Sequence, residues 1–107
     1  MPYRIDAFTL PEAARPEFER RSLETIGLLR RQPGFISDTW FEKVAGDGGV
    51  NVVTVVEWQD EASILAAGQA VRAMHAANAF DPAAFAREYG IGESKAIYMP
   101  RDIAREV

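Results

Sequence analysis

The segment VNVVTVVEWQDE, residues 50–61, decides how this chain folds, because its chemistry changes abruptly at Trp58. Five valines crowd its first seven positions, and β-branched side chains pack well on a pleated surface. Such an apolar run predicts a strand that is covered on both faces. Carboxylates then follow, with Asp60 placed to cap a helix and Glu61 suited to the positive end of its dipole. The segment therefore predicts a buried strand that ends at Trp58 and is followed by a helix, and pocket walls commonly form at such a junction.

The residues before this segment predict a strand, a helix and a second strand. Residues 3–8 alternate in character, and Thr9-Leu-Pro-Glu12 matches a capping box, while Pro16 is expected to delay the main helix. Residues 16–31 have a helical apolar stripe. The second strand is expected over residues 35–44, with Phe35 and Phe41 on one face and Ile36 and Trp40 on the other, and a glycine-rich hairpin loop over residues 45–49 follows.

The residues after it predict two helices and a last strand. A helix is expected over residues 60–78. Its inward stripe would consist of Ile64, Ala67, Val71, Met74 and Asn78, and Gly68 and His75 would lie on the flank of that stripe. Gly68 is expected to mark a close approach to another element. Asp81 and Pro82 open a short helix that Gly90 closes. Residues 95–99 form the last strand, and residues 101–107 a loose helical turn.

The predicted order is β-α-β-β-α-(α)-β, an α+β, ferredoxin-like arrangement with a four-stranded antiparallel sheet. Both long helices are expected to cover one face of that sheet. Trp40, Phe41, Trp58 and the valine-rich strand leave many large apolar side chains for the other face. Because an apolar patch of that size usually meets a partner, we expect a homodimer formed by sheet–sheet packing.

Composition narrows the classes of protein that are compatible with the chain. A length of 107 residues, 48% of them apolar, predicts a single globular domain over residues 1–107. The net charge of −4 and the lack of a basic stripe argue against nucleic-acid binding. No cysteine is present, which suits a cytoplasmic protein, and no apolar span predicts membrane insertion. A single histidine makes a conventional metal site improbable.

The chain resembles the antibiotic biosynthesis monooxygenase (ABM) family of the dimeric α+β barrel superfamily. The resemblance is carried by Pro33-Gly34-Phe35, by VVEWQDEA over residues 55–62 and by Tyr98 in the last strand. It implies a homodimer with packed sheets and a cavity between the sheet and the helices of each subunit. It also implies no cofactor in the quinone-forming members, where the deprotonated substrate reduces O2 itself.

Positions that are typical of two ABM subgroups are mostly changed here. Quinone-forming members carry Asn four positions before the junction Trp, Tyr six after it and Arg twenty after it, where this chain has Thr54, Ile64 and Asn78. Haem-degrading members carry Trp nine and His nineteen positions after it, where this chain has Ala67 and Ala77. His75 is two residues away from the second of these positions, about 200° around a helix. Only Trp58 matches.

Trp58 and His75 are the candidate catalytic residues. The Trp58 indole could stack on an aromatic substrate or donate its N–H to a substrate oxygen, and His75 could act as a general base. The alternatives are a core aromatic for Trp58 and a structural or exposed histidine for His75. Candidate substrate-binding residues, which would otherwise be core or dimer-interface residues, are Trp40, Thr54, Tyr89, Tyr98 and Phe85.

The sequence thus predicts a protein that binds a small apolar or aromatic molecule. It is compatible with a cofactor-independent monooxygenase acting on an aromatic or quinol-type substrate with O2. The alternatives are a non-catalytic ligand-binding protein on the same dimeric scaffold and, less favoured by the substitutions at positions 67 and 77, a haem-binding protein.

Overall fold

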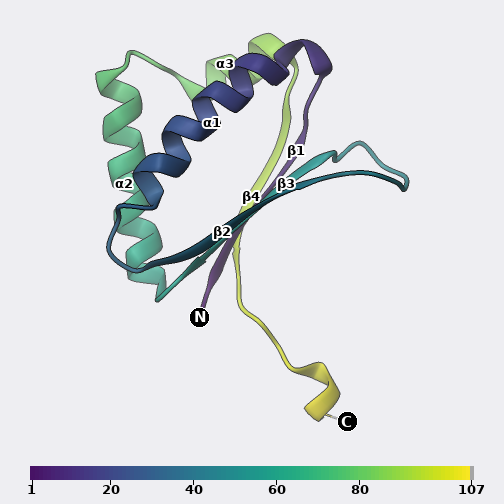
Figure 1. Cartoon of the computed structure of the whole chain (residues 1–107), viewed down its shortest axis with the longest axis vertical. Helices are drawn as coiled ribbons and strands as arrows, with labels where there is room; N and C mark the ends of the chain where they lie inside the picture. Colours follow the sequence, from purple (N-terminus) through teal and green to yellow (C-terminus); the bar gives the residue numbers. More distant parts are fainter. Residues whose placement is uncertain (107) are drawn as a thin grey trace.

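The computed structural model describes residues 1–106 as one sheet with helices on one of its faces (Figure 1). The elements follow the predicted order, with two short 3-10 helices added: β1 (Tyr3–Thr9), η1 (Glu12–Ala14), α1 (Arg15–Leu29), β2 (Phe35–Glu42), β3 (Val52–Trp58), α2 (Glu61–Ala77), α3 (Pro82–Tyr89), β4 (Gly92–Tyr98) and η2 (Ile103–Glu106). The turn predicted for the tail is present as η2, and Val107 lies outside the described residues.

The four strands form an antiparallel sheet in the order β2-β3-β1-β4. The valine-rich β3 is internal, as predicted, and it aligns Val55 with Ile5 of β1. This arrangement confirms the ferredoxin-like α+β fold. No helix within residues 1–106 is long and apolar enough to cross a membrane.

The core consists of two clusters on the helix-facing side of the sheet. One cluster contains Phe8, Phe18 and Val52, and the other contains Trp58 and Ile64. Small or polar side chains stand between them, among them Thr54 on β3 and Ser22 and Thr25 on α1. Because these side chains do not fill the space between the clusters, a cavity remains there.

The predicted alternation of β2 is wrong at its start because β2 contains a bulge. Phe35 aligns with Trp58, but the next aligned pair is Ser37 with Glu57, so Ile36 is an extra residue. Phe35 and Trp40 consequently both lie on the helix-facing side, while Ile36 is exposed. Neither Trp40 nor Trp58 therefore lies on the outer face of the sheet. Phe41 does lie there, and it is 52% exposed.

The ends of the helices confirm three of four predicted caps. The Asp60 and Asp81 side chains accept hydrogen bonds from the first-turn N–H groups of α2 and α3, and Gly90 ends α3 with a left-handed φ of 68°. The capping box at Thr9 is wrong, because Pro11 occupies the cap position of η1 and no side chain caps it. The helix pattern there is interrupted, so α1 begins only at Arg15.

The inward stripe of α2 is rotated relative to the prediction. Ile64, Ala67 and Val71 face the cavity, but so do Gly68 and His75, whereas Met74 does not and Asn78 is an exposed cap residue. Gly68 does not mark a close approach, since a Cβ there would meet only the Arg72 side chain at 3.4 Å. The rotation moves His75 from the flank of the helix to the cavity wall.

Candidate functional site

A cavity of about 350 Å³ lies between the helix-facing side of the sheet and the helices. All four strands contribute to its floor, and α1 and α2 supply most of the opposite wall. Its size is at the lower end of the range usual for small-molecule pockets. Trp40 and Trp58 line it from β2 and β3, whereas its charged floor residues lie mostly on β1 and β4, with Phe8 of β1 and Asp38 of β2 as the exceptions.

Trp58 ends β3 and closes the aromatic half. Its side chain is only 2% exposed, and the ring meets Phe35 edge-on with centroids 5.7 Å apart. Within residues 1–106 the indole N–H donates no hydrogen bond, yet no sealed and unpaired polar atom occurs there. The N–H is therefore not sealed off, and because Trp58 lines the cavity, a ligand oxygen there can accept from it.

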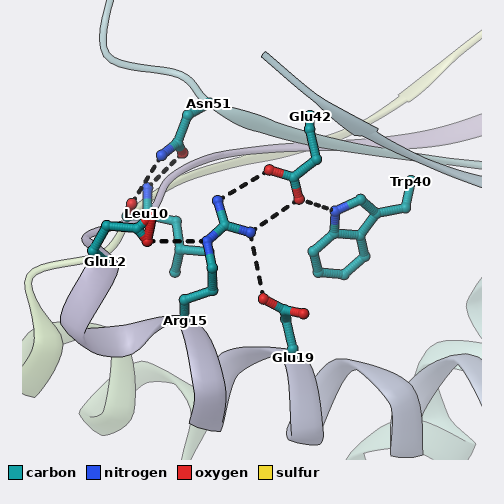
Figure 2. Close-up of polar contacts among 7 residues, drawn as sticks. All are labelled: Leu10, Glu12, Arg15, Glu19, Trp40, Glu42 and Asn51. Carbon is teal, nitrogen blue, oxygen red and sulfur yellow. Dashed lines mark hydrogen bonds and ion pairs between the residues drawn. The ribbon is translucent and has the colours of Figure 1, made fainter. Parts of the chain in front are cut away.

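Trp40 forms the second aromatic wall and is held by a polar network (Figure 2). Its indole N–H donates to Glu42 at 2.6 Å, and Glu42 accepts two hydrogen bonds of 3.0 Å from the Arg15 guanidinium of α1. The ring packs edge-on against Phe18, 5.8 Å between centroids. Arg15, and secondly Trp40, lower the pKa of the Glu42 carboxyl, which keeps it ionised.

Asn51 fixes the backbone beside this network rather than the ligand (Figure 2). Its side-chain oxygen accepts from the Leu10 N–H and its amide donates to the Leu10 carbonyl, both at 2.8 Å. Asn51 thereby acts as an additional strand residue that holds the chain where it leaves β1 and enters η1.

The other half of the cavity is charged. Arg4 and Asp6 of β1 form an ion pair of 2.8 Å, and Lys95 of β4 lies 3.5 Å from the carboxylate of Glu93. Arg72 lies on α2 opposite this floor and is without an ion pair among residues 1–106. Both pairs are half-buried, and all four of their side chains line the cavity, where a ligand can meet them.

His75 lies on the same wall, one helical turn beyond Arg72. Burial lowers its pKa, and the nearby cations Lys95 and Arg21 lower it further, against a weaker opposing influence of Glu24. Its ring packs edge-on against Phe80, 5.2 Å between centroids. The imidazole is consequently neutral at pH 7 and able to accept a proton.

The structure brings five of the seven candidate residues to this cavity and leaves two elsewhere. Trp58, His75, Trp40, Thr54 and Phe85 line it. Tyr89 packs on the first core cluster, with its ring 4.8 Å from Phe85, and lines a neighbouring surface hollow instead. Tyr98 lies on the outer face of the sheet and is 50% exposed.

Sequence reasoning missed the seven charged residues that line the cavity: Arg4, Asp6, Arg21, Asp38, Arg72, Glu93 and Lys95. A signal was present for two of them, since Arg4 and Asp6 share the strand face of the apolar Phe8. Arg72 also stands four residues after Gly68 and three before His75, the spacing of one helix face. No group of three or more potential metal-ligating side chains occurs within residues 1–106.

Comparison with known proteins identifies the class to which this fold and cavity belong. The family profile of antibiotic biosynthesis monooxygenases matches residues 1–79, and the chain belongs to that family. No curated protein matches the sequence.

Solved structures confirm the fold. A candidate monooxygenase from Shewanella loihica superposes with a TM-score of 0.71 at 19% identity, covering 94% of this chain and 93% of the other. The cofactor-independent oxygenase SnoaB from Streptomyces nogalater gives 0.64 at 21% identity, with 94% and 93% covered. The haem degrader MhuD from Mycobacterium tuberculosis, solved with two haems bound, gives 0.69 at 22% identity, with 94% and 95% covered.

The structure also locates the positions that distinguish the ABM subgroups. Thr54, Ile64 and Ala67 line the cavity, while Ala77 and Asn78 are exposed at the end of α2. Polar groups nevertheless reach the cavity from α2 at Arg72 and His75. The polar groups that α2 contributes to the cavity are therefore at positions 72 and 75 rather than at 64, 67, 77 or 78.

Proposed function

We propose that this ABM-family protein is a cofactor-independent monooxygenase that takes a small aromatic, quinol-type substrate into the cavity. One observation carries the proposal: the accessible indole N–H of Trp58 and the neutral imidazole of His75 line the same cavity. The first can donate to a substrate oxygen and the second can accept a phenolic proton. The similarity of the fold to an oxygenase that needs no cofactor supports the same reading.

In this mechanism His75 removes a phenolic proton on the charged side of the cavity, and the Trp58 indole donates to a second substrate oxygen on the aromatic side. The electron-rich ring then reduces O2. The ring carbon para to the resulting oxyanion takes one oxygen atom of O2 and becomes a carbonyl carbon, and the oxyanion becomes the second carbonyl of the quinone. The other oxygen atom leaves as water with the hydrogen of that ring carbon and the proton held by His75. Substrate and O2 supply all the electrons, and the protein contributes orientation and charge stabilisation.

A non-catalytic ligand-binding protein is the alternative that a specific observation favours. Within residues 1–106 no carboxylate hydrogen-bonds to His75, so no acidic side chain among them orients its imidazole as a base. Haem binding has less support, although one protein of this fold was solved with haem. Turnover of added haemin under reductant and O2, above a protein-free control, would favour that function.

We also propose a cytoplasmic homodimer, joined through the outer face of the sheet. The outer side chains alternate with those lining the cavity and are mostly apolar: Tyr3, Ile5, Ala7, Phe41, Val53, Val55, Ala96 and Tyr98. Light scattering at micromolar concentration should give twice the chain mass, and Val55→Asp should give the monomer mass because it places a charge in the interface. A monomeric wild type would contradict the proposal.

Oxygen consumption tests the enzymatic function. A screen of hydroxyquinol-type and anthrone-type compounds should find one whose O2 uptake exceeds that without protein. Trp58→Phe keeps most of the apolar area but removes the free N–H, so kcat should fall about 10-fold or more, equivalent to ~1.4 kcal/mol. Trp40→Phe is the matched comparison, because its N–H is already engaged by Glu42 and its loss should change KM more than kcat. Unchanged kcat with a lower Tm for Trp58→Phe would return Trp58 to a core role.

A further inference from the structure

The register of the sheet orders the cavity floor from aromatic to cationic. One row of helix-facing side chains crosses all four strands, with Trp40 aligned to Thr54, Thr54 to Asp6 and Asp6 to Lys95. The adjacent row runs from Asp38 through Val56 and Arg4. Trp58 lies on β3 two residues beyond Val56, so the cavity lies between it and Trp40 along the strands, and Lys95 lies on the β4 edge. A ligand that spans this floor from β2 to β4 meets the Trp40 ring at one side and basic groups, with their paired carboxylates, at the other.

The charges at the basic end are not balanced by the chain itself. Apart from His75, the cavity is lined by four basic side chains and three carboxylates, although the whole chain carries −4. Each of these carboxylates already has a basic partner, Arg4 for Asp6, Lys95 for Glu93 and Arg30 for Asp38. Arg72 at the cavity mouth is the lining cation without an ion pair among residues 1–106. An anionic group of the ligand would give Arg72 an ion-pair partner.

We propose that the ligand is an aromatic acid, with its rings against Trp40 and Trp58 and its carboxylate at Arg72 and Lys95. This inference rests on the proposed function and names the substrate class of the same cavity. From β2 to β4 the floor spans three inter-strand spacings, about 14 Å. That length, less the side chains at each end, suits a bicyclic or tricyclic ring system that carries one carboxylate. The Arg72 guanidinium can grip a carboxylate with two parallel hydrogen bonds.

The conformation of Arg72 permits this role without strain on the fold. The residue is largely exposed on α2, and its guanidinium lies back over the turn that contains Gly68. Gly68 has no side chain, so the space beside the guanidinium stays open toward the cavity. The lack of a side chain at Gly68 thus keeps this space open, and it does not serve a close approach between elements.

The test compares two ligands that differ only in charge, 2-naphthoate and 2-naphthamide, by calorimetry at pH 7 and low salt. Wild type should bind the carboxylate about 10-fold more tightly or better, the scale of a charge-assisted contact. Arg72→Gln should abolish that preference by lowering the affinity for the carboxylate much more than the affinity for the amide, while Arg72→Lys should restore part of the preference. Arg87→Gln is the matched control, an exposed arginine of α3 outside the cavity.

Each outcome bears on one proposal. Equal affinity of wild type for both ligands, or a preference that survives Arg72→Gln, would overturn the aromatic-acid inference and leave the cavity as a binding site. Binding of neither naphthalene ligand, together with no hit in the oxygen-uptake screen, would overturn the proposed function as well. Loss of the preference in Arg87→Gln would show that the overall charge of the protein, rather than Arg72, selects the acid.

Discussion

The aromatic and the charged half of the cavity share one sheet but differ in how their side chains are held. Trp58 is 2% exposed and packed against Phe35, and Trp40 is fixed through Glu42. Arg72, by contrast, is largely exposed and unpaired among residues 1–106. Burial of large apolar side chains stabilises a fold, whereas exposed charges contribute little to stability and much to specificity. We therefore expect the aromatic half to support the fold and the charged half to select the ligand.

The largest difference between the halves is expected in the stability of truncation variants. Trp58→Ala should lower the free energy of unfolding by about 3–5 kcal/mol, because it removes a buried aromatic ring and leaves a cavity. Arg72→Ala should change it by no more than about 0.5 kcal/mol, as expected for an exposed helix position. Urea denaturation of both variants measures the contrast. Comparable losses would mean that the two halves do not divide stability and recognition.

Ligand binding in the charged half should depend on pH through His75. At pH 7 the imidazole is neutral, since burial and the charges of Lys95 and Arg21 lower its pKa, with Glu24 opposing them. As the pH falls through this lowered pKa, His75 gains a proton and adds a positive charge near the ligand. The affinity for 2-naphthoate should rise by about 3- to 10-fold between pH 7.5 and 5.5, because a bound anion and His75 protonation favour each other.

Two controls isolate His75 in that measurement. The amide analogue carries no charge, so its affinity should not rise over the same range. In His75→Gln the 2-naphthoate curve should be flat. Without ligand, the depressed pKa means that the unfolded state binds the proton first, so stability is full above pH 6.5 and falls as the pH drops below it. A 2-naphthoate affinity that falls with acidification would place the histidine outside the field of the carboxylate.

The sequence predicted the aromatic half of this cavity better than the charged half. The change from valines to carboxylates at Trp58 is a local signal, and both the strand end and the Asp60 cap are where it indicates. The placement of Trp40 depends on the bulge at Ile36, which only the pairing with β3 creates. No rule of local propensity contains that information, because a bulge depends on the partner strand.

The charged half eluded prediction because its residues come from three separate elements. Arg4, Lys95 and Arg72 belong to β1, β4 and α2, and nothing in sequence spacing joins them. Charged residues on a strand are ordinarily assigned to a solvated face. Here the face is covered by helices but also hollow, since small side chains such as Thr54 and Gly68 leave room for the charged groups.

The smallest expected effect concerns the link that holds Trp40, and it tests whether the aromatic half is as rigid as the comparison requires (Figure 2). Glu42 joins the Arg15 guanidinium to the Trp40 indole, so Glu42→Gln weakens both contacts while keeping the shape of the side chain. The affinity for uncharged 2-naphthamide should fall by about 2- to 3-fold, since an ordered wall loses less entropy on binding. Tryptophan fluorescence should also shift, because the Trp40 indole loses an ionic acceptor.

The pKa of Glu42 is lowered by Arg15 first and by Trp40 second, so the wild-type link persists above the ordinary carboxyl pKa and is lost as the pH falls through the lowered value. Wild type and variant should therefore differ at pH 7 and converge only once the pH is below the lowered pKa of Glu42. A difference that persists unchanged into acid would show that Glu42 acts through its shape, and the wall would then owe its order to Phe18 alone.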